Sequence, residues 1–171
     1  MIQTNQVRKK LFQIPNNFYT KENKYAILST LFGLGYCRYM PGTLASAVTI
    51  IVGYLFLYLG NVQFLIFMII TYISLIYACV KLKPAKDYSY IVSDEVIGQL
   101  IPMIILKGDF STPDIILTIS IFLLFRLLDI KKVWIVKWFE TRFSGAAGII
   151  LDDFVAGVLA LFIGLLIFII M

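Results

Sequence analysis

The sequence predicts an all-α, polytopic membrane bundle with about five membrane-embedded helices and its polar motifs gathered on the cytoplasmic side. Of its 171 residues, 60% are hydrophobic, whereas an ordinary soluble domain is about 45–50% apolar. The mean hydropathy is +0.90. The apolar residues form solid runs without the alternation of barrel strands, which favours helices. Since no polar linker divides the chain, we expect one membrane-embedded domain over residues 25–171.

Five stretches are the candidates for membrane crossings. About 20 helical residues span the hydrocarbon layer of a bilayer, and the three longest runs approach that length. The third run reaches it only with its polar preface from Ile91, and the fourth is marginal. In chain order the runs are Leu44 to Gly60, Val62 to Val80, Val96 to Leu106, Ile115 to Leu128 and Phe154 to Met171.

The basic residues orient these crossings. Lysine and arginine are frequent in residues 1–24, in the loop Lys81 to Lys86 and in the segment Arg126 to Arg142, whereas the intervening loops carry one lysine. Cytoplasmic loops carry the excess of positive charge, so we expect these three segments in the cytoplasm. No small-residue cleavage site follows residues 1–24, and we therefore expect a retained basic N-terminal segment.

Residue types missing from the chain exclude several kinds of chemistry. There is no histidine, which removes Ser-His-Asp triads and the usual zinc sites. The two cysteines, Cys37 and Cys79, lack the arginine six residues later that a cysteine phosphatase needs, and we expect both to be reduced. The net charge is +5, and the basic residues lie between the apolar runs. This position indicates contact with anionic membrane lipids and not with nucleic acid.

Half of the ten acidic residues lie at the ends of apolar runs on the predicted cytoplasmic side. Each has a structural explanation of its own, since Ser93 or Asp94 can cap one helix and Asp152 another. Arg126 and Asp129 lie three residues apart on one helix face and can form an internal ion pair. The five acids are Asp94, Glu95, Asp129, Asp152 and Asp153.

Capping does not explain why these acids share one side, or why basic residues accompany them. A site for a hard cation does explain it, because Mg²⁺ takes oxygen ligands from carboxylates, water and substrate phosphate. The nearby arginine and lysine side chains are suited to bind phosphate oxygens.

A glycine-rich segment, from Gly33 to Thr43, precedes the first apolar run. It is neither a P-loop nor a dinucleotide-binding motif. One interpretation is a turn into the first helix with Thr43 as its N-cap. The other is an anion site, formed by the backbone N–H groups at the helix start around Gly42 and by the Thr43 hydroxyl.

Taken in order, these motifs resemble the phosphatidylglycerophosphatase A family of bacterial membrane lipid phosphatases. The resemblance covers about Ala26 to Gly157 and depends on four motifs at matching separations. They are the glycines and Pro-Gly-Thr at residues 33–43, Ile-Val-x-Asp-Glu-x-x-Gly at 91–98, Phe-Arg-x-x-Asp-x-x-Lys at 125–132, and Gly-x-x-x-Asp-Asp-x-x-Ala-Gly at 148–157.

The resemblance implies Mg²⁺-dependent hydrolysis of phosphatidylglycerophosphate, in the inner leaflet, to phosphatidylglycerol and phosphate during phospholipid synthesis. It implies a multi-pass protein of the bacterial inner membrane with its active site facing the cytoplasm. By position, the five acids match the acidic residues of the family, and Arg126 and Lys132 match its basic ones.

Within that chemistry we expect Asp94, Asp152 and Asp153 to hold the metal. Glu95 or Asp129 is expected to accept the proton of the attacking water. An aspartyl-phosphate intermediate, for example on Asp153, is the alternative route. The phosphate is expected to contact Gly42, Thr43, Arg126 and Lys132.

Two other functions fit the same carboxylates. A small membrane cation transporter would use them as an ion site, but it predicts acids near the middle of the membrane. A non-catalytic paralogue would bind the lipid without hydrolysing it. A lipid alcohol-phosphate transferase would need aspartates repeated along one helix, and the sequence has no such repeat. The oligomeric state is not predicted.

Overall fold

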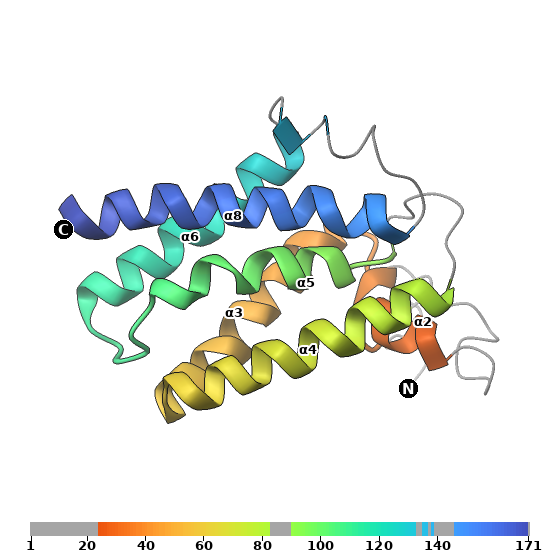
Figure 1. The fold of residues 1–171 in the computed structure, drawn as a ribbon, viewed down its shortest axis with the longest axis horizontal. Coiled ribbons are helices and arrows are strands. Elements are labelled where there is room, and N and C mark those ends of the chain that lie inside the picture. The colour runs from red at the N-terminus through yellow and green to blue at the C-terminus, as the bar shows by residue number, and fades with distance from the viewer. Residues whose placement is uncertain (1–23, 83–89, 133–134, 137, 139–145, 171) are drawn as a thin grey trace, which may run out of the picture.

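The computed structural model describes residues 24–82, 90–132, 135–136, 138 and 146–170, and every regular element in these ranges is a helix (Figure 1). The all-α prediction is therefore confirmed for this part of the chain. The basic segment 1–24, apart from Lys24, lies outside the described residues, as do loop residues 83–86 and 139–145.

Within the described ranges, three helices are long and apolar enough to cross a membrane. They are α3 (Pro41–Leu59), α4 (Asn61–Leu82) and α8 (Ala146–Ile170). In α8 the candidate membrane span is Ala147–Ile170. Much of their surface is exposed and apolar, for example at Ile73 in α4 and Leu166 in α8. Such surfaces are costly in water and suited to contact with lipid.

The described residues thus contain three candidate crossings where the sequence predicts five. The run Val96 to Leu106 is divided between α5 (Ser93–Leu100) and the short 3₁₀ helix η3 (Pro102–Ile105). The 8 residues of α5 extend over only about 12 Å, and proline disrupts the hydrogen bonding of a continuing α-helix. Helix α6 (Thr112–Lys131) has 20 residues, but it carries too many charged residues to count among the candidate membrane crossings.

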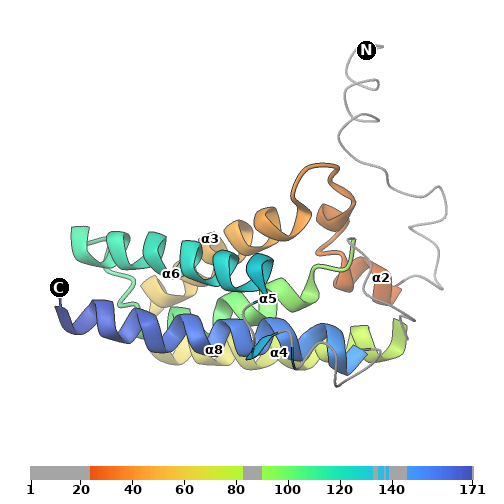
Figure 2. The ribbon, with the colours of Figure 1, turned by 90° about the horizontal axis from the view of Figure 1, so that it is seen from above.

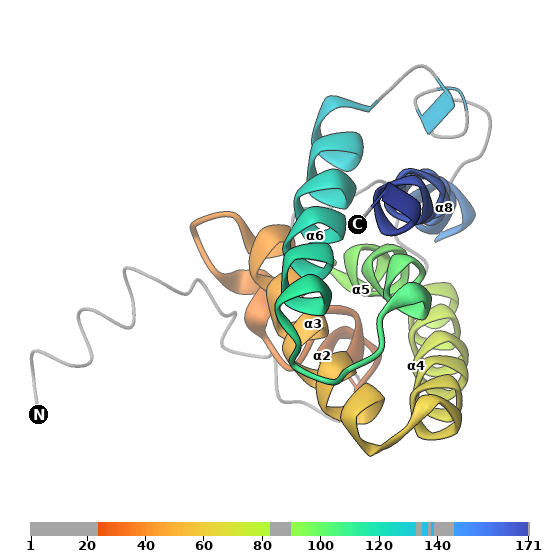
Figure 3. The same cartoon turned by 90° about the vertical axis from the view of Figure 1, so that its left-hand side faces the viewer.

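Helix α5 lies at the centre of the bundle and packs against α3, α4 and α8, while α6 packs against α8 (Figure 3). Seven of its eight residues are buried. The short helix α2 (Lys24–Ser29) covers α4 near the N-terminal end of α5. The central position of α5 brings its acidic first turn into the interior of the protein.

The two ends of the bundle differ (Figures 1 and 2). The turn between α3 and α4, the start of α6 and the C-terminus of α8 lie at one end. The starts of α5 and α8, the end of α4 and helix α2 lie at the other. This grouping is the one needed for distant polar motifs to converge at a single end.

A buried carboxylate ties helices together at the end away from these motifs. The Tyr54 hydroxyl in α3 donates a 2.5 Å hydrogen bond to Asp114 in α6. The backbone N–H groups of Lys107 and Gly108 also donate to the Asp114 carboxylate, at 2.8 and 2.9 Å. Asp114 therefore fixes the connection between η3 and α6 to the end of α3.

Candidate active site

Three acidic side chains from two helices meet in the interior. Asp94 and Glu95 lie in the first turn of α5, and Asp153 lies in α8. One carboxylate oxygen from each lies within 4.8 Å of the other two. Asp94 and Asp153 are only 6% and 3% exposed. Such a group of buried oxygen donors is what a hard divalent cation requires.

Two glycines explain why α5 and α8 approach so closely. A Cβ atom added to Gly157 would lie 2.3 Å from the carbonyl oxygen of Gly98. A Cβ atom added to Gly98 would lie 2.6 Å from the carbonyl oxygen of Asp153. The two backbones are therefore in contact. Asp94 precedes Gly98 by four residues, and Asp153 precedes Gly157 by four, so each acid shares a helix face with its glycine one turn away.

Helix α6 adds an ion pair to this cluster. Arg126 Nη1 lies 2.6 Å from Asp129 Oδ2, which confirms the ion pair expected from their spacing. Both side chains are largely buried, with 12% and 14% exposure. The negative charge of Asp129 also acts on the neighbouring carboxylates of Glu95 and Asp153. The Nε group of Arg126 makes no hydrogen bond to a described residue, so this guanidinium retains donor capacity for a ligand.

Asp152, the first aspartate of the pair in α8, lies beside Lys132 and not in the group of oxygen donors. Asp152 Oδ2 lies 3.1 Å from Lys132 Nζ, and Asp152 Oδ1 accepts a 3.0 Å hydrogen bond from the Asp153 N–H. The group of three oxygen donors contains Glu95 and not Asp152. The structure thus brings Asp94 and Asp153 together with Glu95, and it places Asp152 beside Lys132.

The glycine-rich segment ends directly against the acids. A Cβ atom added to Gly42 would lie 1.9 Å from Glu95 Oε1 and 3.1 Å from Arg126 Nη2. Only glycine allows α3 to begin this close to both charged groups. Thr43 is in the same first turn, and its buried Oγ1 has no hydrogen-bond partner among the described residues.

The backbone around Thr43 differs from the predicted N-cap. The N-cap of α3 is Met40, in a left-handed conformation with φ 47°, and Pro41 is the first helical residue. The first hydrogen bond within the helix runs from the Leu44 N–H to the Met40 carbonyl, at 3.1 Å. The N–H groups of Gly42 and Thr43 therefore have no partner within the helix, and such groups favour an anion.

The capping interpretations of the acids are also wrong. The N-cap of α5 is Val92, which makes no side-chain capping hydrogen bond, so neither Ser93 nor Asp94 is the N-cap residue. Ser93 Oγ is buried without a hydrogen-bond partner among the described residues. Helix α8 begins at Ala146, so Asp152 lies inside the helix and cannot be its N-cap. Placing buried carboxylates here is costly, and helix capping does not offset that cost.

The local balance of charge favours binding of a cation. Among the described residues, the five acids of the site are accompanied by two basic groups, Arg126 and Lys132. Burial raises the pKa of Glu95, and the negative charge of Asp129 adds to this, whereas Asp94 and Arg126 oppose it. A bound divalent cation would compensate the excess negative charge and stabilise the ionised carboxylates.

Gly98 and Gly157 belong to two of the sequence motifs, but no role was predicted for them. The signal was present, because Asp-x-x-x-Gly occurs at residues 94–98 and again at 153–157. A glycine one turn after each acid indicates two helix faces that can approach closely. The sequence cannot show that the two faces contact each other.

The fold and the site define an all-helical protein of the membrane type, in which buried acids and bases face the N-terminus of an apolar helix. The family model for phosphatidylglycerophosphatase A matches residues 27–168. The chain belongs to this family, and it is accordingly a phosphatase.

Curated relatives support this assignment. Phosphatidylglycerophosphatase A of Escherichia coli is 33% identical over 141 residues, which cover 81% of this chain and 80% of that protein. The protein of the same name from Haemophilus influenzae is 30% identical over 145 residues, covering 82% and 86%. A relative from Bacteroides thetaiotaomicron, whose provisional name is phosphatidylinositol-3-phosphatase, is 30% identical over 143 residues, covering 77% and 86%. No solved structure matches the chain.

Proposed function

We propose that this protein hydrolyses phosphatidylglycerophosphate to phosphatidylglycerol and inorganic phosphate during phospholipid synthesis. The names of two relatives give the substrate. The observation that carries the proposal is the meeting of Asp94, Glu95 and Asp153 beside Arg126 and the first turn of α3. This arrangement offers ligands for a cation and donors for a phosphate within one buried site.

The donor set fits Mg²⁺, the cofactor that the sequence analysis expects. Carboxylate oxygens are the protein ligands that Mg²⁺ prefers, and Glu95 Oε2 is buried without a hydrogen-bond partner among the described residues. Asp94, Glu95 and Asp153 would hold the ion. When bound, it would neutralise phosphate charge and polarise a phosphoryl oxygen.

The phosphate group would lie against the start of α3. A phosphomonoester at neutral pH carries nearly two negative charges, which repel a nucleophile until they are neutralised. The N–H groups of Gly42 and Thr43, the Thr43 hydroxyl and the Arg126 guanidinium would donate hydrogen bonds to its oxygens. Lys132, which holds Asp152, adds a second positive charge at the same end of α6.

We assign the acceptance of the water proton to Asp129. Its carboxylate pairs with Arg126 and interacts electrostatically with Asp153, whereas Glu95 belongs to the oxygen-donor group. The water oxygen would attack phosphorus, the ester bond between phosphorus and the lipid oxygen would break, and that oxygen would take up a proton to become the lipid hydroxyl.

We place this reaction at the cytoplasmic face of the bacterial inner membrane. Support comes from three apolar helices long enough to cross a membrane and from the bacterial origin of the relatives. The excess of basic residues in the segments around the site indicates the cytoplasmic side. Anionic lipids would contact those basic residues.

The test is phosphate release by the purified protein from a panel of lipid phosphomonoesters, with Mg²⁺ and with EDTA. The panel contains phosphatidylglycerophosphate, phosphatidic acid and phosphatidylinositol 3-phosphate. We expect the highest kcat/KM for phosphatidylglycerophosphate, loss of turnover in EDTA and recovery when Mg²⁺ is added. Full turnover in EDTA would remove the metal from the proposal. A higher kcat/KM for phosphatidylinositol 3-phosphate would make that lipid the substrate in place of phosphatidylglycerophosphate.

A further inference from the structure

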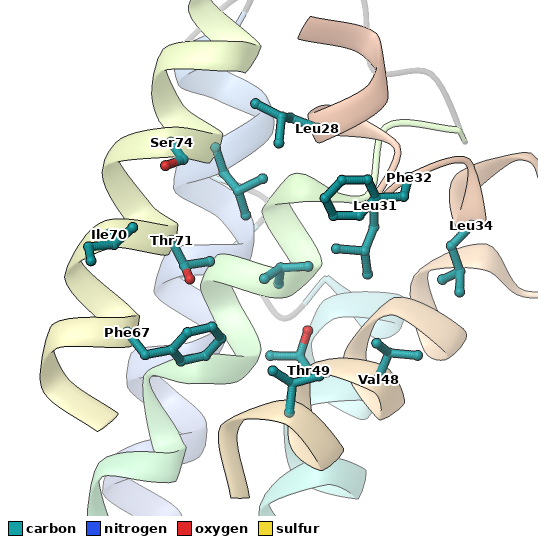
Figure 4. A pocket seen from close by; sticks show the side chains of 13 residues that line it. Leu28, Leu31, Phe32, Leu34, Val48, Thr49, Phe67, Ile70, Thr71 and Ser74 are labelled. Carbon is teal, nitrogen blue, oxygen red and sulfur yellow. The ribbon is translucent and has the colours of Figure 1, made fainter. Parts of the chain in front are cut away.

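A cavity of about 400 Å³ lies between α2, α3, α4 and α5 (Figure 4). Side chains of α4, including Phe67 and Ser74, face it from one side, and Leu31 and Val48 face it from the other. Its volume is in the range of small-molecule sites, about 300–1,000 Å³. Nothing in the proposed chemistry uses this cavity.

The lining of the cavity is suited to hydrocarbon. Most of the side chains are aliphatic or aromatic, and the polar atoms are hydroxyls such as those of Thr49 and Thr71. Thr49 Oγ1 already donates a 2.8 Å hydrogen bond to the Ala45 carbonyl. A water molecule needs two to four polar partners, and the polar side chains of this lining are limited to a few hydroxyl groups. Two of the four walls, α3 and α4, are helices apolar enough to border lipid.

Two helices carry residues of both the cavity and the acidic site. In α5, Val96 lines the cavity and its neighbour Glu95 belongs to the acidic group, so the two lie at the same level of this helix. In α3, Thr49 lies seven residues after Gly42, which is two turns along the same helix face and about 10 Å deeper. A lipid whose phosphate lies at Gly42 would therefore extend along this face of α3 into the cavity.

A buried amide lies on the same side of α5 as Glu95. Gln99 is four residues after Glu95, so it occupies the same helix face one turn deeper. Its side chain is completely buried, and neither its oxygen nor its nitrogen has a hydrogen-bond partner among the described residues. An unpaired buried amide is costly, and a polar group of a ligand would satisfy it.

We propose that the cavity binds one acyl chain of the lipid phosphomonoester substrate, and that Gln99 binds the polar ester linkage between this chain and the phosphate. The inference rests on the proposed function. The order of groups along such a lipid is phosphate, glycerol ester and hydrocarbon. Along the face of α3 the order on the protein is the Gly42 turn beside the acids and then the apolar cavity. Gln99 lies one turn beyond Glu95 in the neighbouring helix α5.

The first test fills the cavity. Ser74→Trp places a large side chain into it from α4, and Ile73→Trp places the same side chain on the neighbouring residue, which is 65% exposed. For Ser74→Trp we expect the KM for a dioleoyl substrate, relative to a dihexanoyl substrate with the same headgroup, to rise about tenfold. Ile73→Trp should keep the ratio of the unaltered protein. An unchanged ratio in both variants overturns the proposal.

The second test does not depend on turnover. A lipid phosphomonoester with a photoreactive acyl chain should label the α4 segment between Phe67 and Leu75, as read by mass spectrometry of peptides. Excess unlabelled phosphatidylglycerophosphate should suppress this labelling, and phosphatidylcholine should not. Equal suppression by both lipids would assign the cavity to bulk lipid and overturn the inference. Labelling without phosphate release from any lipid would overturn only the proposed function.

Gln99 has its own test. Gln99→Leu removes an unpaired amide and keeps a similar volume, so the melting temperature should stay the same or rise. The KM for the dioleoyl substrate should nevertheless increase about tenfold, because a buried hydrogen bond to the ligand is lost. A lower melting temperature with unchanged KM would make Gln99 a structural residue, contrary to the proposal.

Discussion

The backbone of Gly157 in α8 lies directly against the carbonyl group of Gly98 in α5, so closely that a Cβ atom at residue 157 would be 2.3 Å from the Gly98 oxygen. This contact determines the distance between the two helices that carry Asp94 and Asp153. It therefore controls the geometry of the acidic site without contributing a functional group.

Gly157→Ala should reduce activity by separating α5 from α8. Alanine favours a helix over glycine by about 1 kcal/mol, but the added methyl group would overlap backbone that cannot move alone. We expect kcat/KM to fall by about 100-fold or more, since small misplacements of catalytic groups have effects of this size. Phosphate release from phosphatidylglycerophosphate gives the measurement.

Gly164→Ala is the matched control on the same helix. Its Cβ atom would meet the Cδ1 methyl of Ile105 and the Cγ2 methyl of Ile121, each at 2.9 Å, and side-chain methyl groups adjust more readily than backbone. This variant should keep near-normal activity. Equal losses in both variants would show that any alanine in α8 is harmful and would contradict the role of the Gly98–Gly157 contact.

Asp153→Asn should remove most of the activity, because an amide replaces one of the three grouped carboxylates. We expect kcat to fall by about 100-fold and half-activation to require more Mg²⁺. The measurement is phosphate release across a Mg²⁺ titration. Asp109→Asn, an exposed acid outside the site, is the control and should follow the unaltered curve. A normal titration for Asp153→Asn would contradict the metal assignment.

Lys132→Gln should raise the KM for the phosphorylated lipid about tenfold, because a positive charge near the phosphate is lost and Asp152 loses its ion partner. The neighbouring Lys131→Gln removes the same charge from an exposed position. That control should change KM by much less, since exposed charges are screened by solvent and salt. Steady-state kinetics at low and high salt distinguish the two. Equal effects would indicate a general attraction to the membrane surface.

Tyr54→Phe should lower stability without affecting the acidic site. It removes the hydrogen bond to Asp114 at the opposite end of the bundle, which should cost about 1–2 kcal/mol. Tyr58→Phe, at a 66% exposed position, should cost less than about 0.5 kcal/mol. Thermal unfolding in detergent gives the comparison. A large loss of activity in folded Tyr54→Phe would show coupling between the two ends.

Much of the fold follows from local pattern. Solid apolar runs predict helices because period-two alternation is missing, and α3, α4 and α8 confirm three of these runs. The run Val96 to Leu106 was predicted less well, since Pro102 falls inside it and a single proline indicates only a probable break. The structure divides this run into α5 and η3.

The sequence by itself determined the family and the residues of the candidate site. The motifs place every expected acid and base near one end of the bundle, because each motif lies next to an apolar run and carries its own residues. They also determined the ion pair of Arg126 with Asp129, since a spacing of three residues on a helix is a local relation.

Only the tertiary structure decided which of these residues share a site. Glu95 joins Asp94 and Asp153, while Asp152 pairs with Lys132. Adjacent residues on a helix point about 100° apart. The rotation of α5 and α8 and the distance between them therefore decide whether one acid or both acids of an adjacent pair reach the site. That closeness depends on a contact between glycines 59 residues apart, and no periodicity within either helix specifies it.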